Sequence, residues 1–321
     1  MKKIAIISII LSLIAIAGEA FIFATQRDDD DKVYQEAIRR DYRVFSPIVP
    51  DTLYYAGERV PTELFYVHEG IDRELTSIMY QQLNTQLVIK RASRYFPEID
   101  SILQSMGMPR DLRYVCVTES SLTNATSPAK AKGFWQFMEG TAKQYGLEVS
   151  DEIDMRFDYV AETKAACEYM RYLYDRFNSW TLSAAAYNRG HNGLAKQQNE
   201  QQSDSYYDMY LNTETSRYVY RILAYKIILE NPQDYGFYVR KCDQYPQIPY
   251  TTAKLSGQNI DLIEYARQQN CPYKVFKMMN PWLISDKLRN PRGNTYTVKI
   301  PTEYNREKIV GKKDTSILTK V

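Results

Sequence analysis

The chain has 321 residues, enough for about two domains. Its 41 basic and 39 acidic side chains leave a net charge of +2, so the composition gives no sign of the basic excess that nucleic-acid binding requires. With only two histidines, His68 and His191, the chain is too poor in imidazole for a histidine-based metal site or a Ser-His-Asp triad. We therefore expect no metal, no cofactor and no nucleic acid.

The first 26 residues read as an export segment. Lys2 and Lys3 precede an apolar run, and the acidic residues 28–31 follow it. This order of charge and hydropathy is typical of a signal peptide or a signal anchor. Ala15-Ile16-Ala17 resembles a small-residue cleavage site, so cleavage there remains open, but residues 4–25 are about long enough to span a bilayer. We favour an inner-membrane anchor with the rest of the chain in the periplasm of the bacterial cell envelope.

Residues 27–75 are predicted to form an extended approach segment, because Pro47, Pro50 and Pro61 interrupt regular structure. Short strand-like pieces are the most that this segment offers. From residue 72 to 106 apolar side chains recur at helical spacing. Pro97 is predicted to split off a second helix over residues 99–106.

One carboxylate stands out in residues 113–146. Counted from Leu112, the next side chains of one helical stripe are Val115, Cys116 and Glu119, at positions 3, 4 and 7. This spacing places Glu119 on the same side of a helix as three apolar side chains. A carboxylate in such a place is costly unless it is paired. A structural ion pair is the ordinary explanation, because structural pairs often mimic sites.

The following segments predict further helices. Asp158 is placed to cap a helix over residues 159–177, and a segment with three consecutive alanines, 184–186, permits close helix packing. The polar residues 196–205 are predicted to form a loop. A last helix over residues 214–230 ends at Asn231-Pro232.

The remainder predicts a small α+β module in the order strand, helix, helix, strand, over residues 250–255, 259–269, 273–279 and 296–300. Residues 302–321 are charged and predicted to be disordered. The fold class is therefore mainly α, with a small α+β module at the C-terminus. The four cysteines lack a CxxC spacing, so neither zinc nor redox chemistry is predicted. Cys116 and Cys167 fall on apolar stripes, and a Cys242–Cys271 pair is left open.

Four segments in order resemble the catalytic domain of lytic murein transglycosylases, the goose-lysozyme-like soluble-transglycosylase type, and within it the membrane-bound D type. The segments are RYFPEIDSILQSMGMPRDLRYVCVTESSL, NATSPAKAKGFWQFMEGTAKQYGL, LSAAAYNRGHNG and ETSRYVYRIL. The resemblance covers residues 76–235 and implies a lysozyme-like helical domain. Residues 245–301 resemble a LysM module, a binder of wall glycan, in which residues 256–259 replace the usual Gly-Asp-Thr.

The resemblance implies cleavage of the β-1,4 bond between N-acetylmuramic acid and N-acetylglucosamine in peptidoglycan. The muramyl C6 hydroxyl attacks C1 and leaves a 1,6-anhydro end, with the substrate's N-acetyl oxygen meeting the positive charge. Ordinary glycosidases use two carboxylates about 5 to 9 Å apart, whereas here Glu119 alone would act as acid and then as base. That role needs a carboxyl whose pKa burial has raised.

The resemblance also implies roles for residues around Glu119. Ser120 would orient Glu119 or the sugar, while Gln136 and Met138 would line the subsite. Tyr187 and Asn188 would face the acid across the groove. Glu214 and Tyr218 are implied as wall residues. The implied partners are peptidoglycan glycan strands, and the membrane through the N-terminal segment; the sequence does not identify any protein partners.

Two alternatives remain open from the sequence. A muramidase would use the same fold and acid with an attacking water, and would need a second carboxylate. Asp151, Asp154 and Asp158 are the candidates, although none lies in a matching motif. The other alternative is a catalytically inactive cell-wall-binding protein.

Overall fold

The computed structural model describes residues 32, 35–36 and 45–310. The chain divides into two compact units, residues 1–46 and 47–321, and the description below concerns the second. The predicted export segment, residues 1–26, lies outside the described residues. Among the helices of the described part, none has both the length and the apolar character to cross a membrane.

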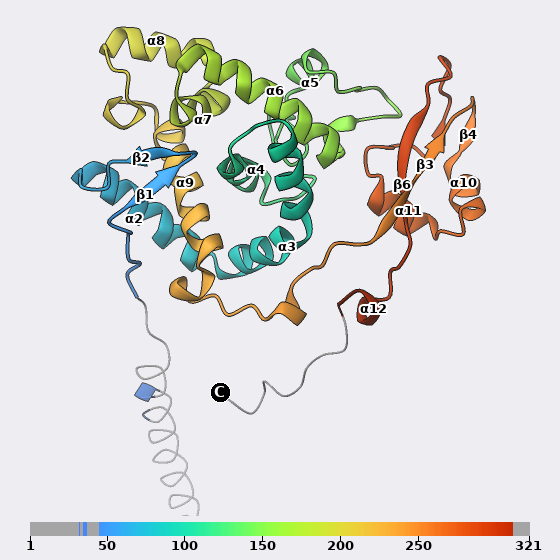
Figure 1. The fold of residues 1–321 in the computed structure, drawn as a ribbon, viewed down its shortest axis with the longest axis horizontal. Helices are drawn as coiled ribbons and strands as arrows, with labels where there is room; N and C mark the ends of the chain where they lie inside the picture. Colours follow the sequence, from blue (N-terminus) through green and yellow to red (C-terminus); the bar gives the residue numbers. More distant parts are fainter. Residues whose placement is uncertain (1–31, 33–34, 37–44, 311–321) are drawn as a thin grey trace, which may run out of the picture. The chain divides into compact units, whose positions relative to one another are not determined.

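Helices build most of residues 47–235 (Figure 1). An antiparallel hairpin of β1 (Leu53–Tyr55) and β2 (Glu58–Val60) precedes them. The helices are α2 (Phe65–Tyr80), α3 (Gln82–Ser105), α4 (Arg113–Ser120), α5 (Glu139–Gln144), α6 (Tyr159–Phe177), α7 (Trp180–Arg189), α8 (His191–Gln201) and α9 (Thr213–Glu230). Helix α4 is largely enclosed, since the side chains from Tyr114 to Val117 are all fully buried.

Local capping explains where several helices begin. Asp158 accepts a hydrogen bond from the Val160 N–H at the start of α6, as predicted. Ser179 caps α7 through the Leu182 N–H, and Asn212 caps α9 through Thr215 N–H. Each cap satisfies a backbone donor that the helix itself leaves free. The three alanines of α7 are fully buried, which allows neighbouring helices to approach closely.

Three local predictions were wrong. Helix α3 runs through Pro97 without a break, and its buried residues beyond the proline keep it on the core. A proline removes one backbone bond, which burial of the following turns outweighs here. Residues 65–70 belong to α2 rather than to an extended segment, and residues 196–201 form the second half of α8 rather than a loop.

The C-terminal module has the predicted order of strand, helix, helix, strand. Its long strands β3 (Tyr250–Leu255) and β6 (Tyr296–Pro301) pair antiparallel, with Leu255 opposite Tyr296. Between them lie β4 (Ile260–Asp261), α10 (Leu262–Gln268), α11 (Tyr273–Met279) and β5 (Lys287–Leu288). A separate hydrophobic cluster fills this module. The mainly helical fold with a small α+β module is thus confirmed.

Two remaining predictions concern the cysteines and the tail. Cys116, Cys167 and Cys271 are free, buried thiols, so the pairing left open for Cys271 is not formed. In the predicted disordered tail, residues 306–310 form the short helix α12 (Arg306–Val310), which contradicts the prediction there. Residues 311–321 lie outside the described part.

Candidate active site

Glu119 lies at the end of α4, at the edge of the main hydrophobic core. The three apolar members of its stripe, Leu112, Val115 and Cys116, are fully buried, whereas Glu119 itself is partly exposed. Ser121 and Leu122 follow with φ of 55° and 57°, in the left-handed region. This sharp turn ends α4 at Ser120, with Ser121 as the C-cap, so Glu119 belongs to the last helical turn and remains accessible from one side.

Tyr218 holds the Glu119 carboxyl directly. Its phenol O–H donates to Glu119 Oε1 over 2.5 Å, and the Tyr218 side chain, on α9, is almost fully buried. Within the described part of the chain, no second hydrogen-bond donor reaches this carboxyl. One carboxyl oxygen, Oε1, is therefore oriented by the protein, and Oε2 accepts no hydrogen bond from the described residues.

The surroundings of Glu119 bring its pKa into the neutral range. Burial is the largest influence and raises the pKa to about 7. The hydrogen bond from Tyr218 and the positive charge of Arg221 lower it, while the nearby Glu214 raises it. Both protonation states are therefore accessible near pH 7, which is the condition for a group that first donates and then accepts a proton.

Tyr187 and Asn188 end α7 on the neighbouring side of the site. The Tyr187 phenol donates to the backbone oxygen of Trp135 over 2.7 Å. Burial raises the pKa of Tyr187 strongly, and the charge of Glu119 adds to that rise, which places the two side chains within electrostatic reach. Asn188 donates to Glu214 over 3.2 Å and accepts from Thr215 over 3.0 Å. Asn188 is thus tied to α9 rather than to Glu119.

Gln136 and Met138 come from the segment between α4 and α5, whose residues 124–137 we call the GFWQ loop. The Gln136 side-chain amide donates to Ala125 O over 3.1 Å and to Gly133 O over 2.7 Å, and its backbone has a φ of 53°. Gln136 therefore braces the loop from within. Met138 is 48% exposed and precedes α5, so it is available at the surface beside the loop.

Ser120 connects helix α4 to the same loop. Its hydroxyl lies 2.9 Å from Phe134 O and 3.1 Å from Cys116 O, both acceptors, and Ser120 is 8% exposed. No hydrogen bond joins Ser120 to Glu119 in the described structure. The geometry fits an orienting role that acts through the loop backbone.

Sequence reasoning missed Glu162, a fully buried carboxylate on α6. It accepts hydrogen bonds from the Phe134 N–H over 2.8 Å and the Trp135 N–H over 2.9 Å. A Cβ on Gly133 would lie 1.8 Å from Arg156 O and 2.4 Å from Glu162 Oε1. No motif could reveal Glu162, because its partners are backbone groups 27 and 28 residues earlier in the chain.

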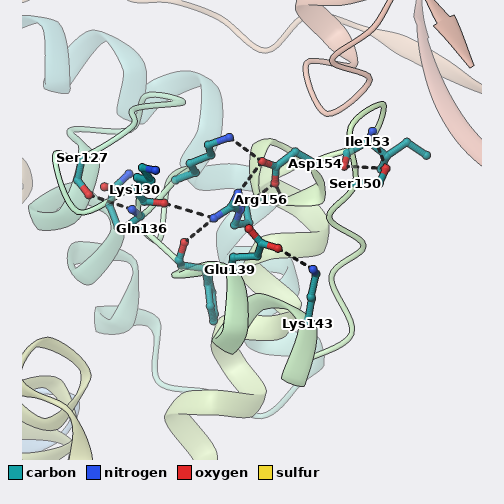
Figure 2. Close-up of polar contacts among 12 residues, drawn as sticks. Ser127, Lys130, Gln136, Glu139, Lys143, Ser150, Ile153, Asp154 and Arg156 are labelled. Atoms are coloured by element: carbon teal, nitrogen blue, oxygen red, sulfur yellow. Dashed lines mark hydrogen bonds and ion pairs between the residues drawn. The ribbon is translucent and has the colours of Figure 1, made fainter.

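The candidate second carboxylates of a muramidase are engaged elsewhere. Asp154 pairs with Arg156 (Figure 2) and with Lys132, Asp158 caps α6, and Asp151 is exposed. The described residues include no hydrogen bond from any of the three to Glu119. No group of three or more His, Cys, Asp or Glu in the described part is placed to hold a metal ion.

Two family models match the chain. The transglycosylase SLT domain matches residues 98–210, and the soluble lytic transglycosylase C-terminal LysM-like domain matches residues 251–304. Two Escherichia coli proteins named membrane-bound lytic murein transglycosylase D are each 34% identical over 163 residues, which are 49% of this chain. The match spans 36% of the length of those relatives.

A solved structure is also similar. The X-ray structure of an inactive mutant of the lytic transglycosylase Slt from Pseudomonas aeruginosa matches 61% of this chain and 34% of that one, with 17% identity and a TM-score of 0.40. This likeness is too low to support a further argument. Residues 98–210 thus match a transglycosylase SLT domain and residues 251–304 a LysM-like domain of the soluble lytic transglycosylase kind, and the chain is distantly homologous to membrane-bound lytic murein transglycosylase D.

Proposed function

We propose that the chain is a peptidoglycan lytic transglycosylase that cleaves between N-acetylmuramic acid and N-acetylglucosamine and forms a 1,6-anhydromuramyl end. The observation that carries the proposal is Glu119, a carboxyl with a pKa near 7 that a single buried phenol orients. The SLT domain that contains Glu119 belongs to a family of transglycosylases, which supports the same conclusion.

In the proposed reaction, Glu119 begins protonated and its free oxygen donates the proton to the glycosidic oxygen as the bond breaks. The resulting carboxylate then accepts the proton of the muramyl C6 hydroxyl as that oxygen bonds to C1. The proton count balances, because Glu119 ends the cycle protonated. Tyr218 supports the carboxylate stage by donating to Oε1.

The other site residues are proposed to hold the glycan strand rather than to transfer protons. Gln136 and Met138 would line one side of the subsite, and Tyr187 and Asn188 the other. Glu214, which Asn188 contacts, would form part of the wall. Ser120 would fix the distance between Glu119 and the GFWQ loop through its bond to Phe134 O.

The proposed location is the bacterial cell envelope, with the bulk of the chain in the periplasm and residues 4–25 as the anchor. The name of the curated relatives, which includes the term membrane-bound, supports this. The proposed parts are an export segment to residue 26, an approach segment, a catalytic domain over residues 76–235 and a glycan-binding module over residues 245–301. Glycan strands are the proposed partner of both domains.

The test is product analysis of peptidoglycan by mass spectrometry after incubation with the purified full-length chain. We expect 1,6-anhydro ends, and a loss of about 100-fold or more in the Glu119→Gln variant, because that variant lacks the proton. Glu63→Gln is a matched control in an exposed ion pair with Arg59 and should keep full activity. Reducing ends would instead indicate a muramidase, and wild-type binding without any cleavage would indicate an inactive wall-binding protein.

A further inference from the structure

Residues 149–157, which we call the strap, lie between α5 and α6. The strap packs against the C-terminal module. Ile153 is 2% exposed and belongs to the hydrophobic cluster of that module. The Asp154 N–H donates to Trp282 O over 2.8 Å, and the Ile284 N–H donates to Glu152 O over 3.0 Å. The strap therefore belongs by sequence to the SLT domain and by packing to the module.

The opposite side of the strap contacts the GFWQ loop through one carboxylate. Asp154 is 1% exposed, and its Oδ2 lies 3.0 Å from Lys132 Nζ and 2.8 Å from an Arg156 terminal nitrogen. Oδ1 accepts from Arg156 Nε over 2.8 Å. Arg156 in turn donates to the backbone oxygen of Lys130 (Figure 2) and to that of Phe137, each over 3.4 Å.

These contacts fall on the base of a tight hairpin in the loop. Lys132 and Phe137 exchange two backbone hydrogen bonds of 3.1 Å and thereby enclose Gly133 to Gln136. Lys130 and Gln136 have φ values of 66° and 53°, a region that residues other than glycine occupy only when their surroundings fix them. The loop thus depends on support from outside itself.

We propose that Asp154 is a positioning residue through which the C-terminal module holds the GFWQ loop in its working shape. The inference rests on the proposed function, since it takes the loop to be part of the catalytic site. The module would then do more than bind glycan, because it completes the support of the loop. Removing the Asp154 carboxylate leaves the charges of Lys132 and Arg156 without their buried partner, which loosens both attachments at once.

The first test is steady-state kinetics of the full chain on soluble glycan strands. Asp154→Asn should lower kcat by about 10- to 100-fold and change KM by less than about threefold. A misplaced substrate-positioning segment slows the chemical step more than it weakens substrate binding. Glu264→Gln, on α10 of the module, is the control. Its carboxylate pairs with the exposed Arg267 and contacts neither the strap nor the loop, so kcat should stay close to that of the wild type.

The second test is hydrogen exchange at two loop amides, those of Gly133 and Phe137, which are bonded to Ala125 O and Lys132 O. Exchange should speed up about tenfold or more in Asp154→Asn, and also in Ile153→Ala, which loosens the strap only from the module. Lys132→Met breaks the same link from a partly exposed position, so it keeps the test valid if Asp154→Asn does not fold.

Wild-type kcat in Lys132→Met or in a folded Asp154→Asn overturns the proposal. Loop exchange that is unchanged in Ile153→Ala also overturns it, because the module would then not be the source of the support. A wild-type chain that forms no anhydro product refutes the proposed function instead. In that case the exchange measurements still show whether the module holds the loop.

Discussion

The hydrogen bond from Tyr218 to Glu119 favours the carboxylate form, so it opposes the rise in pKa that burial produces. The proposed reaction needs protonated Glu119 first, and kcat/KM should therefore fall as the pH rises through about 7. Tyr218→Phe removes the donor and keeps the ring. The pKa of Glu119 should then rise further, and the falling limb of the pH–rate profile should move to higher pH, with a maximal rate about tenfold lower because the carboxyl loses its orientation.

The measurement is kcat/KM between pH 5 and 9 for the wild type and Tyr218→Phe. Tyr225→Phe is the control on the same helix, since this buried tyrosine does not contact Glu119. Its profile should follow the wild type. A Tyr218→Phe profile with an unmoved limb would show that Glu119 is not the acid that limits the rate.

The sequence could indicate Glu119 because helical spacing is a local property, and the stripe of Leu112, Val115 and Cys116 is buried as expected. It could not show the contact with Tyr218, which lies 99 residues later. The same limit hid Glu162, whose role is to bind backbone N–H groups of another segment. Side chains that serve distant backbone leave no periodic signal.

At Gly133 the GFWQ loop passes close to both α6 and the strap. Its φ is 88°, and an added Cβ would clash with Arg156 O and Glu162 Oε1. Gly133→Ala should destabilise the chain by about 2 kcal/mol or more and lower activity, because the loop must move off both supports. Thermal unfolding and product formation measure the two effects.

Gly140→Ala supplies the contrast within α5. A Cβ at Gly140 meets no atom within 4 Å, and the residue is helical. Replacing a glycine by alanine in such a place stabilises by up to about 1 kcal/mol. Equal effects of the two substitutions would rule out a special role for the close approach at Gly133.

Helices and strands were predictable where the signals are local. The ranges of α6, α11 and β3 agree with the predictions because caps, prolines and alternation mark their ends. The failure at α8 is instructive: its Lys, Gln and Glu residues are good helix formers, although their polarity resembles a loop. Pro97 was misjudged because the core that retains α3 lies outside the local sequence.

Within residues 47–310, polar contacts that no local sequence pattern predicts join the two hydrophobic clusters. Glu98 of α3 accepts hydrogen bonds from Tyr159 of α6 and from Tyr250 and Lys299 of the C-terminal module. These partners lie up to 201 residues from Glu98 in the sequence. They line a cavity of about 100 Å³ between the two parts. The two modules were predictable from motifs, whereas their junction follows only from the folded arrangement.

The junction should weaken in acid. Burial would raise the pKa of Glu98, but the hydrogen bonds from Tyr159 and Tyr250 and the charge of Lys299 outweigh it and lower the pKa below its ordinary value. A carboxyl of this kind adds stability above its unfolded-state pKa of about 4.3 and loses it as the pH falls through the folded-state value. Glu98→Gln should therefore lower the free energy of unfolding by about 2 kcal/mol at pH 7. Between pH 5 and 3, the variant should lose less stability than the wild type does.

Calorimetric unfolding at pH 7, 5 and 3 compares the two chains. Glu264→Gln is the control, because its exposed pair with Arg267 adds little stability and should leave the acid dependence close to that of the wild type. If Glu98 joins the two parts as the contacts indicate, the wild type should unfold in one transition at pH 7 and separate into two near pH 3, since each part keeps its own hydrophobic cluster. Parallel pH dependence of the wild type and Glu98→Gln would mean that apolar packing around Ile153, rather than this carboxylate, holds the parts together.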